Sequence, residues 1–122
     1  MRLVLDSNVA IKWRLPEEDS EKAIAIKDSY VNGFNELIAP DIFPAEVGHA
    51  LSRAERKGIL KSPQAAEGLK DILLVAPKLY AYIPLLPRAM ELSSATRTSV
   101  YDCLYVSLSE RENCPLLTAD KK

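Results

Sequence analysis

The sequence predicts an α/β protein, a three-layer α/β/α sandwich with a central parallel sheet of four to five strands. Short runs that are apolar throughout, such as Arg2–Leu5 and Glu36–Ala39, are typical of strands buried on both faces of a parallel sheet. Segments with helical spacing of apolar residues separate these runs along the chain. A length of 122 residues suffices for one hydrophobic core, and therefore for a single domain.

The order of elements follows from these runs and from their end signals. In chain order we expect a strand over 2–5, a helical turn or two over 8–13, a helix from 19 or 20 to 33, a strand over 36–39, a helix from 41 to 58, a helix from 62 to about 75, a strand over 80–83, helices over about 88–95 and 100–111, and a strand over 116–118. Asp41 and Ser62 are the expected N-caps of two of these helices. Gly33 and Gly58 are expected to end the two helices that precede them.

The composition limits the possible functions. A net charge of −1 and a pI near 5.9 argue against a protein that holds nucleic acid by bulk electrostatics. No apolar stretch approaches the roughly 18 residues of a membrane span, and no signal segment opens the chain, so we expect a soluble, cytoplasmic protein with no membrane association. Cys103, Cys114 and the single histidine, His49, are too few and wrongly spaced for a disulfide framework or a structural zinc site.

One local cluster of positive charge stands out, formed by Arg53, Arg56, Lys57 and Lys61. These residues lie where a helix is expected to end, and cations there complement the helix dipole. We prefer that interpretation, with phosphate binding as the alternative. The tyrosines and Trp13 fall within apolar runs and are expected in the core, with base stacking as the alternative role.

Four acids are predicted to meet at one edge of the sheet. Asp6 directly follows the first strand, Glu46 lies about one turn into the helix after the second strand, and Asp102 interrupts an apolar helix near its start. Asp120 follows the last strand, in the sequence LLTAD. Ligands of an open parallel sheet bind beyond the carboxyl ends of its strands, where these residues are expected.

Each acid also has a purely structural interpretation, as a helix cap for Asp6 and Asp102, a turn residue for Asp120 and a partly solvated edge residue for Glu46. Their joint placement favours a site. Two like charges about 4 Å apart cost on the order of 4 kcal/mol at an effective dielectric near 20, so the cluster must take up protons or hold a cation. All-oxygen ligands suit Mg²⁺ or Mn²⁺, and such a site would hydrolyse phosphodiesters.

Three polar residues lie close enough in sequence to support these acids by hydrogen bonds, namely Asn8, Ser99 and Thr118. Their structural alternatives are an early helical residue, a helix cap and a strand residue. Neither interpretation is preferred over the other.

The chain resembles the PIN-domain ribonucleases, in the branch of VapC-like toxins from toxin-antitoxin pairs. The resemblance is carried, in order, by VLDSNVAIKW, APDIFPAEVGHAL, ERKGIL and SVYDCLYVSLSERENCPLLTAD, which span essentially the whole chain. It implies an endoribonuclease whose Mg²⁺-binding carboxylates are Asp6, Glu46, Asp102 and Asp120, with Asp120 the less essential. It also implies a homodimer, an RNA substrate, and a small antitoxin that docks over the helices and inserts a residue near the acidic pocket.

Members of that family usually continue past the TAD motif with a short helix and a final edge strand. We therefore expect residues 1–122 to form a single PIN-like domain that is either truncated at its C-terminus or lacks that edge. The alternative function is a non-catalytic module on the same scaffold, which binds an antitoxin-like protein or RNA without cutting it.

Overall fold

The computed structural model describes residues 1–15 and 17–119. Its elements, in chain order, are β1 (Arg2–Leu5), α1 (Ser7–Ile11), α2 (Ser20–Val31), β2 (Glu36–Pro40), α3 (Phe43–Arg56), α4 (Gln64–Leu74), β3 (Lys78–Tyr80), a short 3₁₀ helix η1 (Ile83–Leu85), α5 (Leu86–Thr96), α6 (Val100–Glu112) and β4 (Leu116–Leu117). Within these residues, no helix is both long and apolar enough to cross a lipid bilayer.

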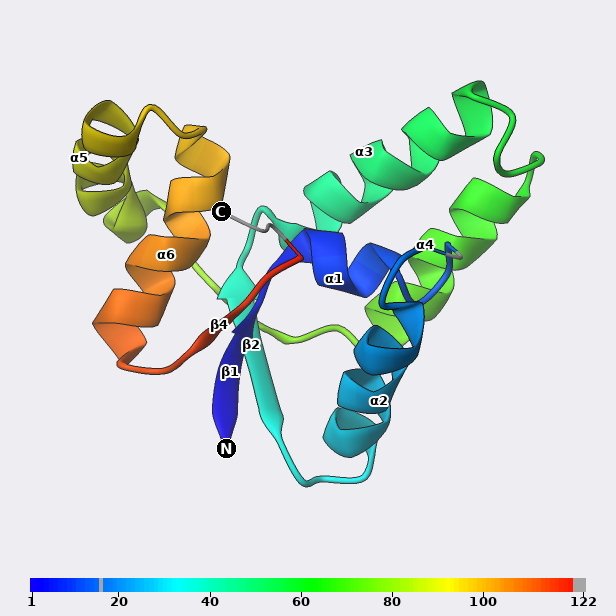
Figure 1. Cartoon of the computed structure of the whole chain (residues 1–122), viewed down its shortest axis with the longest axis horizontal. Helices are drawn as coiled ribbons and strands as arrows, with labels where there is room; N and C mark the ends of the chain where they lie inside the picture. The colour runs from blue at the N-terminus through cyan, green and yellow to red at the C-terminus, as the bar shows by residue number, and fades with distance from the viewer. Residues whose placement is uncertain (16, 120–122) are drawn as a thin grey trace.

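The four strands form one parallel sheet in the order β3-β2-β1-β4. Leu3 pairs with Leu37, and Leu5 pairs with Leu117, so β1 lies between β2 and β4. Figure 1 shows α5 and α6 on one side of this sheet and α1 to α4 on the other. The predicted α/β/α sandwich with a parallel sheet is therefore confirmed.

The core lies on both faces of the two central strands. Val4, Leu5 and Ala39 are fully buried, and Phe43 of α3 and Tyr105 of α6 are buried from opposite layers. Burying one large apolar side chain stabilises the fold by about 1.5–3 kcal/mol. Because both faces of β1 and β2 are covered, these strands need continuous rather than alternating hydrophobicity, which is what made them recognisable in the sequence.

The third strand differs from its prediction. It was expected over residues 80–83, whereas the structure places it at Lys78–Tyr80, paired with β2 through Ile38 and Lys78. This is an edge strand of three residues with two exposed side chains, so its position is set by pairing with β2 rather than by hydrophobicity. Residues 83–85 turn into η1, which contains Pro84.

The two predicted N-caps are also wrong. Asp41 makes no cap bond to α3, because its Oδ1 accepts a hydrogen bond of 3.0 Å from the backbone N–H of Tyr82. α4 begins at Gln64 without a side-chain cap from Ser62. The predicted ends of α2 and α3 are confirmed, because Gly33 and Gly58 follow them with φ of 81° and 79°, values that glycine adopts without strain.

Candidate active site

Asp6 lies directly after β1, at the carboxyl edge of the sheet, and is only 5% exposed. Its Oδ1 accepts a hydrogen bond of 3.3 Å from the backbone N–H of Asn8, and its Oδ2 accepts one of 3.0 Å from the hydroxyl of Thr118. Asp6 therefore caps α1. The structural interpretation of Asp6 as a helix cap is confirmed, and its role in a site stays a prediction.

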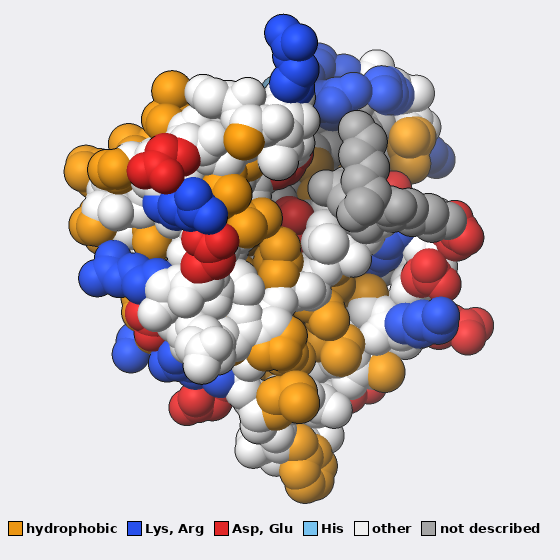
Figure 2. Space-filling view, turned by 60° about the vertical axis from the view of Figure 1, so that its left-hand side comes forward, with side chains coloured by type: hydrophobic (Ala, Val, Ile, Leu, Met, Phe, Trp, Pro, Cys, Tyr) orange, Lys and Arg blue, Asp and Glu red, His pale blue; other side chains and the backbone are white. Residues whose placement is uncertain are grey.

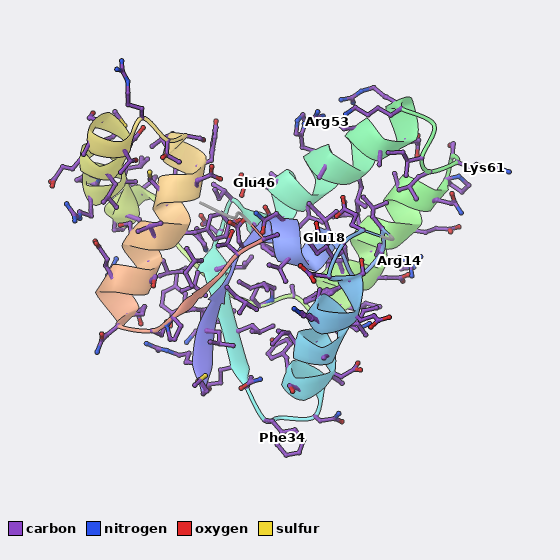
Figure 3. The ribbon with its side chains drawn as sticks, viewed as in Figure 1. Arg14, Glu18, Phe34, Glu46, Arg53 and Lys61 are labelled. Carbon is purple, nitrogen blue, oxygen red and sulfur yellow. The ribbon has the colours of Figure 1, made fainter. Side chains whose placement is uncertain are left out.

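Glu46 lies in the first turn of α3 and is half-buried. Its Oε1 accepts hydrogen bonds from the phenolic hydroxyl of Tyr105, at 2.6 Å, and from the hydroxyl of Ser7, at 3.4 Å. No hydrogen bond from the described residues reaches Glu46 Oε2. Figure 3 shows Glu46 where the start of α3 approaches the start of α1.

Ser7 joins the two carboxylates. Its hydroxyl lies 3.4 Å from Glu46 Oε1 and 3.5 Å from Asp6 Oδ1, so one hydroxyl lies between the N-cap acid of α1 and an acid of α3. Asp102 lies in the first turn of α6 and is also half-buried. The charge of Asp102 raises the pKa of both Asp6 and Glu46, so the three predicted acids lie within electrostatic range of one another.

The pKa values show how costly the negative charge is at this edge. Burial raises the pKa of Asp6 from 3.8 to about 6, and the charges of Asp102 and Glu46 add to the increase against the opposing hydrogen bonds from Asn8 and Thr118. Burial also raises the pKa of Glu46, with a further contribution from Asp102, while the bond from Tyr105 acts in the opposite direction. Three elements thus bring together carboxylates that destabilise one another when charged.

The neighbours of these acids supply hydroxyl and amide donors rather than cations. Within residues 1–15 and 17–119, no Lys or Arg forms an ion pair with Asp6 or Glu46. An all-oxygen set of this kind has the chemistry that Mg²⁺ and Mn²⁺ prefer. In the same residues, no three acidic, His or Cys side chains are already drawn together as a metal site. Asp120, the predicted fourth acid, lies outside the described residues.

The three predicted supporting residues divide between the two roles considered for them. Thr118 donates directly to Asp6. Asn8 contacts Asp6 through its backbone, and its side chain holds the end of β4 through bonds of 3.3 Å to Thr118 Oγ1 and 3.0 Å from Ala119 N. Ser99 caps α6, accepting a bond of 3.1 Å from the backbone N–H of Tyr101.

Ser7 and Tyr105 were not predicted as members of the site. Tyr105 is in the core, 1% exposed, as expected from its apolar surroundings, whereas Tyr101 is 58% exposed. A usable signal existed for both missed residues. Ser7 directly follows Asp6, and Tyr105 lies three residues after Asp102, which places it on the neighbouring turn of the same helix.

One face of the molecule is hollowed. Figure 2 shows acidic side chains at the bottom of a hollow in one face of the molecule, with Lys and Arg side chains gathered above it. Because carboxylates repel a phosphate group, such a group would contact the cations beside the hollow rather than the acids within it.

The chain is similar to known proteins in sequence and in fold. The profile of the PIN domain matches residues 3–122. Ribonuclease VapC3 of Pyrobaculum aerophilum is 32% identical over 124 residues, covering 100% of this chain and 92% of that protein. Ribonuclease VapC1 of Mycobacterium tuberculosis is 37% identical over 86 residues, covering 69% of this chain and 62% of that protein.

A solved structure shares the fold. The crystal structure of VapBC2 from Rickettsia felis, bound to a DNA fragment from their promoter, contains a chain that superposes with a TM-score of 0.67 at 18% identity. The superposition covers 100% of the present chain and 90% of that chain.

Proposed function

The chain belongs to the PIN domain family, and from this premise we propose that it is a ribonuclease that hydrolyses RNA phosphodiester bonds as the toxin of a toxin-antitoxin pair. The observation that carries the proposal is the buried carboxylate of Asp6, whose pKa is raised further by the charges of Asp102 and Glu46. In the described part of the chain, no Lys or Arg forms an ion pair with Asp6. The names of the relatives, Ribonuclease VapC3 and Ribonuclease VapC1, support the same activity.

We assign the ion-binding role to the predicted acids. Asp6, Glu46 and Asp102, together with Asp120 beyond the described residues, would hold Mg²⁺ or Mn²⁺. When bound, the ion would supply positive charge against the phosphate and make a bound water more acidic.

The chain's own residues prepare this arrangement. Ser7 and Tyr105 occupy Glu46 Oε1 and so leave Oε2 for an incoming ligand or water. Thr118 and the backbone of Asn8 fix the two oxygens of Asp6. Fixed donors of this kind orient ligating carboxylates before the substrate arrives, so little reorganisation is needed during reaction.

The partners follow from the same premise. We propose that a small antitoxin protein covers the acidic pocket, that the toxin acts on RNA in the cytoplasm and that it is a homodimer. The support for an antitoxin is that the fold is shared with a chain of the VapBC2 complex.

A second candidate is a PIN scaffold that binds an antitoxin-like protein or RNA without cutting it. It is favoured by one observation, namely that the described acids are not already drawn together as a metal site. Metal binding and RNA cleavage distinguish the two candidates.

The test is cleavage of total RNA by the purified chain in Mg²⁺, Mn²⁺ or EDTA, with Asp6→Asn and Asp102→Asn as variants. We expect cleavage only with metal, and a rate lower by about 100-fold or more in each variant. Asp28→Asn is the matched control, because Asp28 is an exposed acid of α2. Undiminished cleavage by both variants would contradict the assignment, and the absence of both cleavage and Mn²⁺ binding would favour the non-catalytic module.

A further inference from the structure

The face of α3 that carries Glu46 continues outward as a stripe of positive charge, and we propose that this stripe binds the phosphate backbone of the RNA beside the cut site. The α3 basic stripe consists of Arg53 and of Lys57, the C-cap residue of α3, with Arg56 on the adjoining face of the helix. The inference rests on the proposed ribonuclease function, and it assigns a substrate-positioning role to residues outside the acidic pocket.

The geometry of an α-helix aligns these residues with the acid. Arg53 and Lys57 follow Glu46 by seven and eleven residues, and such positions return to within about 20° of the starting direction. At 1.5 Å per residue, they lie about 10 and 16 Å farther along the helix axis. Figure 3 shows Arg53 projecting from α3 beyond Glu46, with Lys61 at the outer tip of the α3–α4 hairpin.

The stripe is exposed and its charge is not neutralised. Arg53, Arg56 and Lys57 are all exposed, and none of them forms an ion pair with a described residue. Among residues 1–15 and 17–119, their one side-chain hydrogen bond runs from Arg56 to the hydroxyl of Ser52, at 2.7 Å. By contrast, six other cations are each in an ion pair, namely Arg2, Lys12, Arg14, Lys22, Arg88 and Arg111.

The helix dipole explains why cations lie at this end of α3, but it does not explain the face on which they lie. Arg53 and Arg56 lie in the last turn of α3, where cations are favourable on any face of the helix. A dipole does not require that Arg53 and Lys57 share the face of Glu46. An RNA strand needs Arg53 and Lys57 on the face of Glu46, because the two cations can then hold neighbouring phosphates while one phosphate reaches the acidic pocket.

An RNA strand also fits the charge of the whole chain. With a net charge of −1, the molecule has no general attraction for phosphates, so a local cluster of cations such as the α3 basic stripe is needed to bind them. The acids in the pocket repel an approaching phosphodiester, and cations two and three turns away offset that repulsion along the strand. An acidic segment of a protein partner is the competing occupant, and RNA binding by charge-loss variants distinguishes it from RNA.

The test compares the double variant Arg53→Gln/Lys57→Gln with a control that loses the same charge elsewhere. Lys27→Gln/Lys78→Gln is that control, because Lys27 lies on α2 and Lys78 on the first residue of edge strand β3. Binding of a short fluorescein-labelled single-stranded RNA is measured in EDTA over a range of salt concentrations, and cleavage of the same RNA in Mn²⁺. Circular dichroism verifies that each variant is folded.

We expect the stripe variant to bind the RNA about tenfold more weakly, with KM raised and kcat within about twofold of the wild type. The slope of log K against log salt should fall by roughly 1.4, at about 0.7 per lost phosphate contact of a single strand. The control variant should leave the RNA affinity, KM, kcat and the salt slope unchanged. The swap Arg53→Lys/Lys57→Arg keeps both charges and should restore binding.

The two failures are distinguishable. If the wild type cuts and binds the RNA while the stripe variant binds it as tightly as the control does, the inference is wrong and the proposed function stands. The same conclusion follows if the stripe variant loses only neutralisation by a co-expressed antitoxin, because the stripe would then serve an acidic protein. If the wild type neither cuts nor binds RNA, the proposed function fails and the inference fails with it.

Discussion

The phenolic hydroxyl of Tyr105 donates a 2.6 Å hydrogen bond to Glu46 Oε1, which joins α6 to the first turn of α3. Tyr105 is 1% exposed. Burial raises the pKa of its hydroxyl, and the bond to the Glu46 carboxylate raises it further, so the group remains a proton donor throughout the neutral range. One buried side chain thus fixes the orientation of an acid that belongs to another helix.

Tyr105→Phe should therefore lower activity without removing any ligand. Loss of the hydroxyl leaves Glu46 Oε1 with Ser7 as its remaining donor, and we expect kcat to fall by about tenfold, with KM little changed. The free energy of unfolding should fall by about 1 kcal/mol. Steady-state cleavage kinetics and urea unfolding measure the two effects.

Tyr30→Phe is the matched control for that variant. The hydroxyl of Tyr30 donates to the carbonyl of Ala76 at 2.9 Å, away from the acids, so its loss should cost a similar amount of stability and leave kcat unchanged. Equal kcat values for the two variants would show that Tyr105 does not position Glu46.

The raised pKa of Asp6 predicts how stability depends on pH without metal. A carboxyl whose pKa is about 6 when folded and 3.8 when unfolded binds its proton more tightly in the folded state. Its contribution to stability is therefore fully present below about pH 4 and is lost as the pH rises from 4 through 6. At neutral pH the loss amounts to about 3 kcal/mol at most.

Asp6→Asn tests this sign. The amide oxygen can still cap α1, and the variant has no charge to destabilise the folded state. In EDTA we expect it to be more stable than the wild type at pH 7, with the difference shrinking toward pH 4. Urea unfolding curves across this range provide the measurement. The stability gain of Asp6→Asn over the wild type should be larger at pH 7 than at pH 4, and the opposite order would show that the charge of Asp6 does not destabilise the fold.

The sequence was informative wherever a side chain's role depended on its own segment. β1, β2 and α6 have enough continuous apolar character to be recognised, and Asp6 and Asp102 were placed correctly at the ends of their elements. β3 was misplaced because an exposed edge strand takes its register from the strand beside it. Tyr105 was assigned to the core, which is correct. Its spacing from Asp102 indicates a place near the acids, but its bond to Glu46 joins helices on opposite sides of the sheet, so the sequence did not identify that partner.

Divalent metal should stabilise the folded protein. If Asp6 and its neighbours hold Mg²⁺ or Mn²⁺, saturation at about 100 times the dissociation constant adds about 2.7 kcal/mol to the free energy of unfolding. Thermal melts at pH 7.5 should show a rise in Tm for the wild type and a much smaller rise for Asp6→Asn. Equal rises in both proteins would place the bound ion elsewhere.

Thr118 follows β4, and its hydroxyl donates a hydrogen bond to Asp6 Oδ2 that a substitution can delete. Thr118→Val keeps the shape and deletes the donor, which should raise the pKa of Asp6 further and lower kcat by about tenfold. Thr118→Ser retains the hydroxyl and should keep most of the activity. If the Val and Ser variants cleave RNA at the same rate, the hydrogen bond to Asp6 has no part in the reaction.

The most direct test is a crystal structure of the wild-type chain soaked in Mn²⁺, with the ion located by its anomalous scattering. We expect a peak within coordination distance of the carboxylate of Asp6 and of at least one of Glu46 and Asp102. A crystal saturated with Mn²⁺ whose peaks all lie away from these three residues would contradict this expectation.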